Sequence, residues 1–289
     1  MCKYNNKLVK HYFKEDLEIL ISTMNRYSLD FLIPMFPFCD FSKFQILILN
    51  QTSKDNLLVS DYPSIRVVNS FDNGISKSRN LAISNSERKI LLFTDDDVVF
   101  KEKFDVVIIQ AYNNNPSVTA ICFQTLTTEG VLYSKYPKNN KILNDKEIRK
   151  VLSIEVSCNS DKIKRDKIKF DELFGLGAQF QDSETFFFLR NMKSKRHKVL
   201  FCPENIVIHK STSSSDEADS DRIIYARMAG FYKIFGFFAY VMLLKYMFFL
   251  FRKYNFSFLE LRNKFFVGLK SIDDYKLIVD QKLDSKNEY

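Results

Sequence analysis

Three consecutive carboxylates, Asp95, Asp96 and Asp97, are the residues of this sequence best suited to chemistry. They follow the apolar run 89–93, so they stand at the end of an expected strand. Carboxylates this close repel one another unless a cation offsets them, and oxygen ligands suit Mg²⁺ or Mn²⁺ bound together with phosphate. An isolated acidic run is more often a solvated turn, but its place after a buried strand favours a metal site.

Other polar residues stand where they could bind a phosphorylated ligand. Arg79 could pair with a phosphate, because its planar fork suits bidentate contacts, and Asn80 follows it. Two polar segments could line a nucleotide pocket or be ordinary loops: Ser22, Thr23, Asn25 and Arg26, and then Asn50 and Gln51.

Candidates for proton transfer come later in the chain. Asp182 and Glu184 precede an expected helix, where acidic residues serve as caps or, in a cleft, as a general base. His209 ends a strand-like segment, and it is a plausible third ligand for a Mn²⁺-type ion as well as an ordinary structural histidine.

The first hundred residues predict the elements that would hold these groups. Short apolar runs bounded by polar turns predict strands, and they lie at 17–22, 44–49, 65–68 and 89–93. A helix is expected at 74–84. This alternation indicates an α/β fold with a mostly parallel sheet flanked by helices, in which ligands bind beyond the carboxyl ends of the strands.

The later elements are less regular. Helices are expected at 103–112 and 183–195, and strands at 118–125, 153–157, 199–202 and 205–209. Gly175 and Gly177 predict a tight turn with a close backbone approach. Residues 211–221 read as a polar loop, and the remainder as helical.

Composition limits the class of protein. The 289 residues carry a net charge of +8 and are 46% hydrophobic, which excludes a disordered chain. Five cysteines, none in CxxC spacing, indicate reduced thiols rather than a disulfide framework or a zinc finger. Because residues 1–20 contain no apolar run typical of a secretory signal, we expect a cytoplasmic location.

Residues 222–266 hold eight basic residues against one acidic residue, together with many Phe and Tyr. Such a stretch suits anionic lipid or nucleic acid. Within it, residues 234–251 have one charge, Lys245, and could span a membrane, pack in a core or lie in the interface. Flanking Arg252 and Lys253 favour the interface, so we expect peripheral attachment to the inner face of the cytoplasmic membrane and no nucleic-acid partner.

Four pieces in order resemble glycosyltransferase family 2. They are Ser22-Thr-Met-Asn-Arg26, Gly74-Ile-Ser-Lys-Ser-Arg-Asn80, Leu92-Phe-Thr-Asp-Asp-Asp97, and Phe170-Asp-Glu-Leu-Phe-Gly-Leu-Gly-Ala178 followed by Asp182-Ser-Glu184. The family consists of inverting enzymes with the GT-A fold. The resemblance covers roughly residues 17–210 and implies a catalytic domain, which we place at residues 1–221. The composition of the remainder predicts a basic, aromatic-rich helical extension over residues 222–289.

The resemblance also implies roles for single residues. Asp95 and Asp97 fall on the DxD positions that bind metal and sugar nucleotide, and Asp96 fills the middle position and could take part. Arg79 and Asn80 match residues beside the phosphates and ribose. Ser22, Thr23, Asn25, Arg26, Asn50 and Gln51 match the base-binding edge.

Glu184 matches the family's acidic catalytic motif. The sequence departs from the family at Asn50, where Asp is usual, and at Thr185, where a second acid is usual. The base therefore remains open between Glu184 and Asp182, and we favour Glu184 because Asp182 stands where a helix cap is expected.

The implied activity is a metal-dependent, hexosyltransferase-type transfer. A sugar would move from a nucleotide-sugar, with UDP favoured, to a cell-surface polysaccharide or another glycan precursor, free or lipid-linked. Without a Q-x-x-R-W motif, single additions are favoured over polymerisation. One alternative is a nucleotidyltransferase that makes the nucleotide-sugar. Such an enzyme needs a Gly-rich loop after its first strand, and no glycine precedes Gly74. The other alternative is a non-enzymatic basic membrane adaptor, which would leave the Asp95–Asp97 cluster without a role.

Overall fold

The structure is a computed structural model, and it describes residues 11–210, 218–254 and 256–281. Cys2 and most of the loop expected at 211–221 lie outside these ranges. The four cysteines inside them, Cys39, Cys122, Cys158 and Cys202, are free thiols.

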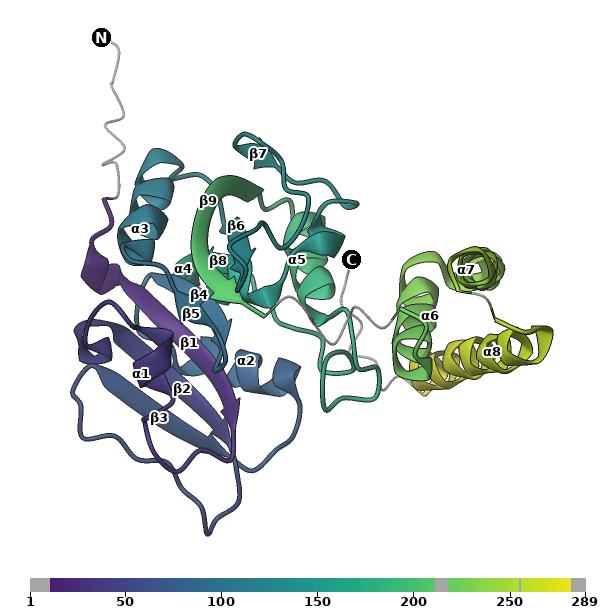
Figure 1. Cartoon of the computed structure of the whole chain (residues 1–289), viewed down its shortest axis with the longest axis horizontal. Coiled ribbons are helices and arrows are strands. Elements are labelled where there is room, and N and C mark those ends of the chain that lie inside the picture. Colours follow the sequence, from purple (N-terminus) through teal and green to yellow (C-terminus); the bar gives the residue numbers. More distant parts are fainter. Residues whose placement is uncertain (1–10, 211–217, 255, 282–289) are drawn as a thin grey trace.

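The first half of the sheet is a parallel block in the order β3-β2-β1-β4 (Figure 1). Its strands are β1 (Leu17–Met24), β2 (Gln45–Gln51), β3 (Ile65–Ser70) and β4 (Ile90–Asp95). Apolar side chains of β1, β2 and β4 are buried on both faces of the sheet, as expected for parallel strands with both faces covered. The carboxyl ends of the four strands therefore meet at one edge.

The second half of the sheet is mixed. It contains β8 (Val156–Asn159), β6 (Ala120–Thr127), β9 (Val199–His209) and β5 (Val99–Phe100), and β7 (Lys141–Ile142) pairs with β9. β8 runs antiparallel to both β4 and β6, whereas β6 and β9 are parallel. Parallel ladders still carry most of the paired residues, and the predicted α/β class is confirmed.

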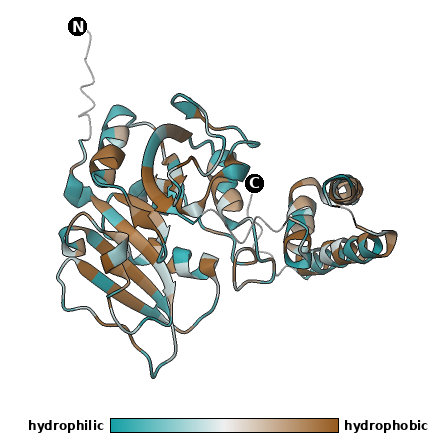
Figure 2. Cartoon of the chain, viewed as in Figure 1, coloured by the Kyte–Doolittle hydropathy of each residue, from teal (hydrophilic) through white to brown (hydrophobic). Residues whose placement is uncertain are grey.

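Helices cover the sheet and form the C-terminal part. They are α1 (Leu32–Met35), α2 (Ile75–Asn85), α3 (Phe104–Asn114), α4 (Ser160–Arg165), α5 (Glu184–Ser194), α6 (Asp221–Phe235), α7 (Ala239–Lys253) and α8 (Phe258–Asp280). Two apolar clusters form the core on the two faces of the sheet. Hydrophobic residues accordingly dominate the strands in Figure 2.

Three predicted boundaries were wrong. The polar residues Thr23 and Asn50 continue β1 and β2 rather than starting loops, because backbone pairing extends to Met24 and Gln51. The segment 153–157 begins with a 3-10 turn, Ser153–Glu155, before β8. The two last predicted strands are one strand, β9, whose register to β6 shifts near Pro203, a residue that cannot donate to the ladder.

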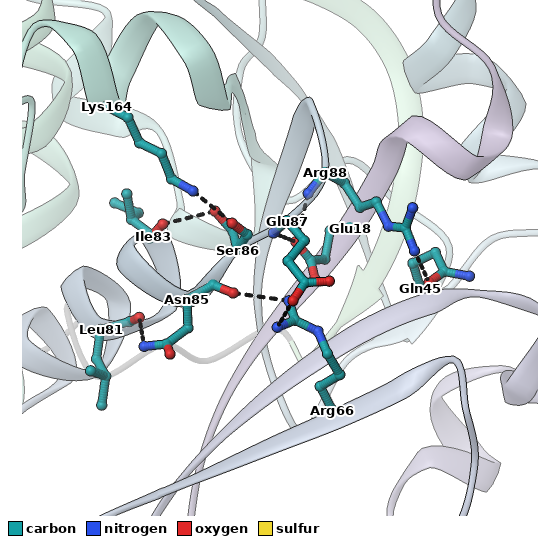
Figure 3. Close-up of polar contacts among 10 residues, drawn as sticks. All are labelled: Glu18, Gln45, Arg66, Leu81, Ile83, Asn85, Ser86, Glu87, Arg88 and Lys164. Atoms are coloured by element: carbon teal, nitrogen blue, oxygen red, sulfur yellow. Dashed lines mark hydrogen bonds and ion pairs between the residues drawn. The ribbon is translucent and has the colours of Figure 1, made fainter.

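A polar cluster closes the opposite, amino end of the sheet (Figure 3). Glu18 is buried at the start of β1, where it accepts hydrogen bonds from Arg66 and from the backbone N–H groups of Glu87 and Arg88. Arg66 also donates to Glu87 and to the carbonyl of Asn85. The buried charge is thus paired, and the cluster ties the end of α2 to β1 and β3.

The three C-terminal helices lie to one side of the sheet and pack around a small core of their own (Figure 1). Ala226 and Ala229 of α6, with Tyr275 and Ile278 of α8, also join the core cluster under the sheet. These contacts fix α6 and α8 against the α/β body. The division into a catalytic domain and an extension at 221/222 stays a prediction, although α6 begins there.

Residues 221–253 are long and apolar enough to cross a membrane by length and composition, with 17% of the most apolar window buried. The run is not one straight helix, because a 3-10 turn at Gly236–Phe238 separates α6 from α7, and the two point in different directions (Figure 1). The prediction of one continuous helix over residues 234–251 is therefore wrong. The 15 residues of α7 extend about 22 Å, less than the about 30 Å of a bilayer's hydrocarbon core.

Candidate active site

A cavity of about 1000 Å³ lies at the carboxyl edge of the parallel block. It joins residues far apart in the sequence, which come from β1, β2, α2, β4, β9, α5 and the C-terminal helices. The predicted residues that line it are Ser22, Thr23, Gln51, Arg79, Asp95, Asp96, Asp97, Asp182, Glu184 and His209. Most of the candidates from the sequence thus meet in one place, as the parallel topology requires.

Arg79 is the centre of this arrangement. It rises from α2 with a side chain only 3% exposed, and its two terminal nitrogens each lie 3.0 Å from a carboxylate, one from Asp95 and one from Glu184. One of them also donates to the hydroxyl of Ser153 at 2.8 Å. Its Nε is buried without a hydrogen-bond partner. Arg79 therefore holds the end of β4 and the start of α5 on either side of itself.

The other two carboxylates of the acidic run have different partners. Asp96 accepts hydrogen bonds from Thr23 and from Arg26, whose Nε lies 2.8 Å from its carboxylate. Asp97 lies 3.5 Å from Nε2 of His209. Asp95 and Asp96 are thus each paired with an arginine, and Asp97 faces His209, which makes the run compatible with a folded strand end.

The pKa shifts follow from these surroundings. Loss of bulk water raises the pKa of Asp95, against the lowering effect of Arg79, and Asp97 and Glu184 raise it further. The hydrogen bond with His209 lowers the pKa of Asp97, and the same bond raises the pKa of His209. Desolvation of Arg79 is outweighed by Asp95 and Glu184, so its pKa is raised and it stays charged.

The donor chemistry fits a hard divalent cation, but not one held by protein alone. Among the described residues, no three His, Cys, Asp or Glu side chains lie close enough together to hold a metal ion. Asp95 and Asp97 both reach the cavity, and Mg²⁺-type ions are commonly held by one or two carboxylates plus phosphate oxygens. A metal at this edge would therefore need the nucleotide's phosphates as further ligands.

Several residues assigned to the nucleotide by resemblance do not line the cavity. Asn50 is fully buried and uses its amide on the backbone of Arg26 and on Asn69. Asn80 holds the backbone of Phe170 and the carboxylate of Glu172. Asn25 and Arg26 lie just outside, in the turn after β1. The contacts of Asn50 and Asn80 shape the walls of the cavity rather than its surface.

Glycines let two loops meet at the cavity. Gly177 has φ +78°, and a Cβ there would lie 3.1 Å from the backbone of Gly74. The N–H of Ile75, the first residue of α2, donates to the carbonyl of Leu176 at 2.9 Å. The predicted close approach is confirmed, and it brings the amino end of α2 against the loop that precedes Glu184.

Asp182 is not the cap that the sequence suggested. The N-cap of α5 is Ser183, in a left-handed conformation and without a side-chain cap hydrogen bond. Asp182 instead lies 3.3 Å from Nε of Arg227 on α6, and Arg227 donates to Tyr246 of α7 at 3.0 Å. Burial raises the pKa of Asp182, while Arg227 lowers it and Glu184 raises it again.

Sequence reasoning missed the far wall of the cavity. Arg149, Lys150 and Ser153 line it from the segment between β7 and β8, and Arg227, Phe231, Ile234 and Tyr246 line it from α6 and α7. The basic, aromatic composition of residues 222–266 was a signal for a binding surface. It did not indicate that part of this surface faces the acidic run.

The comparisons agree with this geometry. The family model of glycosyl transferase family 2 matches residues 12–164, more than half of the chain. A curated protein from Haemophilus influenzae, described as an uncharacterised glycosyltransferase, is 28% identical over 102 residues, which are 33% of this chain and 35% of that protein. The match thus spans about a third of that relative's length.

Solved structures of similar fold include the crystal structure of S. aureus TarS 1-349, with a TM-score of 0.52 and 15% identity over 88% of this chain and 71% of that chain. The same TarS fragment in complex with UDP has a TM-score of 0.50 and 14% identity, covering 75% of this chain and 65% of that chain. These structures share the curled central sheet flanked by helices that is typical of GT-A proteins. Because the family model covers more than half of the chain, including helix α2 with Arg79 and strand β4 with the acidic run at its end, the chain belongs to glycosyl transferase family 2.

Proposed function

We propose that this chain is an inverting, hexosyltransferase-type enzyme that moves a sugar from a nucleotide-sugar to a hydroxyl of a cell-surface polysaccharide or another glycan precursor. UDP is the nucleotide we favour, since a protein of similar fold has been crystallised with it. Because the chain belongs to this family, we favour a transferase over a nucleotidyltransferase and over a non-enzymatic adaptor.

One observation carries the proposal: Arg79 joins Asp95 and Glu184 at a single cavity. A glycosyl transfer needs a site for the leaving diphosphate and a base for the acceptor hydroxyl, with the anomeric carbon between them. The acidic run at the end of β4 stands on the side proposed for the diphosphate, and Glu184 at the start of α5 stands on the side proposed for the base.

Glu184 is the proposed base. The hydrogen bonds that described residues make to its carboxylate, from Arg79 and Thr185, all go to Oε1. Oε2 is therefore the oxygen that would take the proton of the acceptor hydroxyl. Arg79 orients the carboxylate, and the displacement at the anomeric carbon from the side of Glu184 would invert its configuration.

A Mn²⁺ or Mg²⁺ ion, held by Asp95 and Asp97 with His209 as a further ligand, would neutralise the charge of the leaving diphosphate. The bound nucleotide would lie along Ser22, Thr23 and Gln51, which face the cavity beside the acidic run.

Calorimetry with UDP and Mn²⁺ tests this proposal. We expect UDP to bind at least about tenfold more tightly with Mn²⁺ than without it, because the protein alone offers too few ligands. Asp97→Asn should remove most of that gain, whereas Asp55→Asn, an exposed acid outside the cavity, should keep it. If no nucleoside diphosphate binds, with or without metal, and no nucleotide-sugar in a panel is slowly hydrolysed, the proposal fails.

We further propose that the enzyme works while attached to the inner face of the cytoplasmic membrane. Phe237, Val241, Leu244, Phe248 and Phe251, termed here the apolar stripe, recur at spacings of three and four residues and are all exposed. Lys245, Arg252 and Lys253 flank it. An exposed apolar helix face with basic flanks, too short to span, suits a helix lying in an anionic interface.

A further inference from the structure

The cavity has a second, cationic side that the transfer mechanism does not use. Arg149 and Lys150 end the 3-10 turn Ile148–Lys150, are both exposed, and line the cavity. Arg149 has no hydrogen bond or ion pair among the described residues, and its guanidinium lies 5.1 Å from the ring centre of Phe186. Its charge is thus held at the cavity without a carboxylate to neutralise it.

The neighbourhood adds positive charge rather than removing it. Asp145 is the nearby acid, and it already pairs with Arg190 at 3.2 Å and with Lys193 at 2.8 Å. Burial and the approach of Arg190 lower the pKa of Arg149, with Asp145 opposing them. An anion placed beside Arg149 and Lys150 would relieve this repulsion.

This cationic side lies against α5, the helix that begins with the proposed base. Phe186, which Arg149 covers, comes two residues after Glu184 on α5. The carboxylates that would accompany a nucleotide diphosphate stand across Arg79, at the end of β4. An anion at Arg149 is therefore positioned as part of the acceptor.

The wall next to it is apolar and continues to the surface. Phe187 of α5 touches α6 at Gly230, where an added Cβ would lie 3.3 Å from its ring. Phe231 and Ile234 line the cavity on the same helix, and the ring of Phe231 lies 6.4 Å from that of the exposed Phe235. Phe237 and Phe238 come after Gly236 in the next turn, where the apolar stripe begins, and are 78% and 70% exposed. An apolar path thus leads from the cavity to the proposed membrane face.

We infer that the acceptor is a membrane-anchored amphiphile whose phosphate binds Arg149 and Lys150, while its hydrocarbon lies along the path from Phe231 to Phe238. The inference rests on the proposed transferase function, since it assigns the second substrate of that reaction. Charge complementarity fixes the phosphate end, and the order of Phe231, Phe235 and exposed Phe237 and Phe238 along the chain fixes the direction of the hydrocarbon.

Decyl phosphate, below its micelle concentration, is the probe. In titration calorimetry we expect it to bind at least about tenfold more tightly than decanol, inorganic phosphate or glycerol phosphate. The double variant Arg149→Gln/Lys150→Gln should lose about tenfold for decyl phosphate and keep its affinity for UDP. Lys138→Gln/Lys146→Gln removes the same charge from exposed positions outside the cavity, and it should bind decyl phosphate as the wild type does.

Three results would overturn the inference. Soluble phosphates that bind as tightly as decyl phosphate would point to a water-soluble acceptor. Equal losses in the two double variants would mean a non-specific charge effect. A loss of UDP affinity in Arg149→Gln/Lys150→Gln would assign these residues to the donor. Absence of UDP binding in the wild type, with decyl phosphate binding intact, would count against the transferase function alone.

Discussion

Arg79 illustrates how a buried charge can organise a site without itself touching substrate. Its terminal nitrogens are occupied by Asp95, Glu184 and Ser153, and it is almost inaccessible. The phosphate-binding role suggested by the resemblance would require it to leave these partners. The contacts instead favour a positioning role, in which Arg79 sets the distance between the acidic run and the base.

Replacing the base without changing its shape gives the sharpest test at this scale. Glu184→Gln should lower kcat by about 10²–10⁴-fold, because the amide cannot accept the acceptor's proton. UDP binding should persist, since the acidic run is intact. Asp182→Asn is the matched comparison, and it should have the smaller effect on kcat because Asp182 is paired with Arg227. Steady-state kinetics in which Asp182→Asn is the more damaged variant would move the base to Asp182.

A second residue-level prediction concerns Glu155, beside the cavity segment Leu152–Ile154. Burial raises its pKa from the ordinary 4.5 to about 7, although hydrogen bonds from Tyr136, Leu152 and Thr125 oppose the rise. Between these two pH values the native state binds more protons at this group than the unfolded state does. The free energy of unfolding should therefore fall as pH rises from 4.5 to about 7, by about 2–3 kcal/mol from this group.

Glu155→Gln cannot titrate, so it should flatten that dependence even if it is less stable overall. Urea unfolding at several pH values measures it. Equal pH slopes in the two proteins would show that Glu155 is not protonated in the fold.

At the scale of elements, the loop that carries Gly177 decides whether α2 and α5 meet. Gly177 and Gly130 have nearly equal φ, +78° and +79°, but a Cβ at Gly130 would touch nothing within 4 Å. Gly130→Ala should therefore cost only the left-handed strain, about 1–2 kcal/mol. Gly177→Ala should cost more, because the new methyl meets the backbone of Gly74, and it should also lower kcat by displacing Glu184. Thermal unfolding and kinetics of both variants check this, and equal effects would mean that the close approach has no role.

Some of these elements could be predicted from the sequence and others could not. Apolar runs located the parallel strands, because burial on both faces leaves an uninterrupted signal in β2 and β4. Strand ends were missed, since Thr23 and Asn50 are polar yet stay paired in the ladder. The cavity edge followed from topology once the strands were known. Its far wall could not be predicted, because the contact of Arg227 with Asp182 joins residues 45 positions apart and leaves no periodic pattern.

For the whole molecule, the apolar stripe predicts that the protein binds to membranes. Leu244→Ser/Phe248→Ser should reduce binding to vesicles of phosphatidylglycerol and phosphatidylcholine, because both side chains are about 60% exposed on α7. Ile33→Ser/Val59→Ser, at positions at least as exposed (60% and 72%) but on the α/β body, should bind as the wild type does. High salt should weaken the attachment by screening Lys245, Arg252 and Lys253.

Vesicle flotation measures all four conditions. Loss of binding in both double variants, or no binding by the wild type, would contradict the assignment of the stripe.

The link from Asp182 through Arg227 to Tyr246 has a consequence for biosynthesis. The strands and helices that would hold a nucleotide precede α6 and α7 in the chain, so the donor half of the cavity can form on the ribosome first. The acceptor wall is added only when α6 and α7 emerge and dock. A nascent or clipped chain that lacks α6 and α7 would then be a nucleotide-binding protein without this wall for an acceptor, and catalytic competence would arrive only with these two helices.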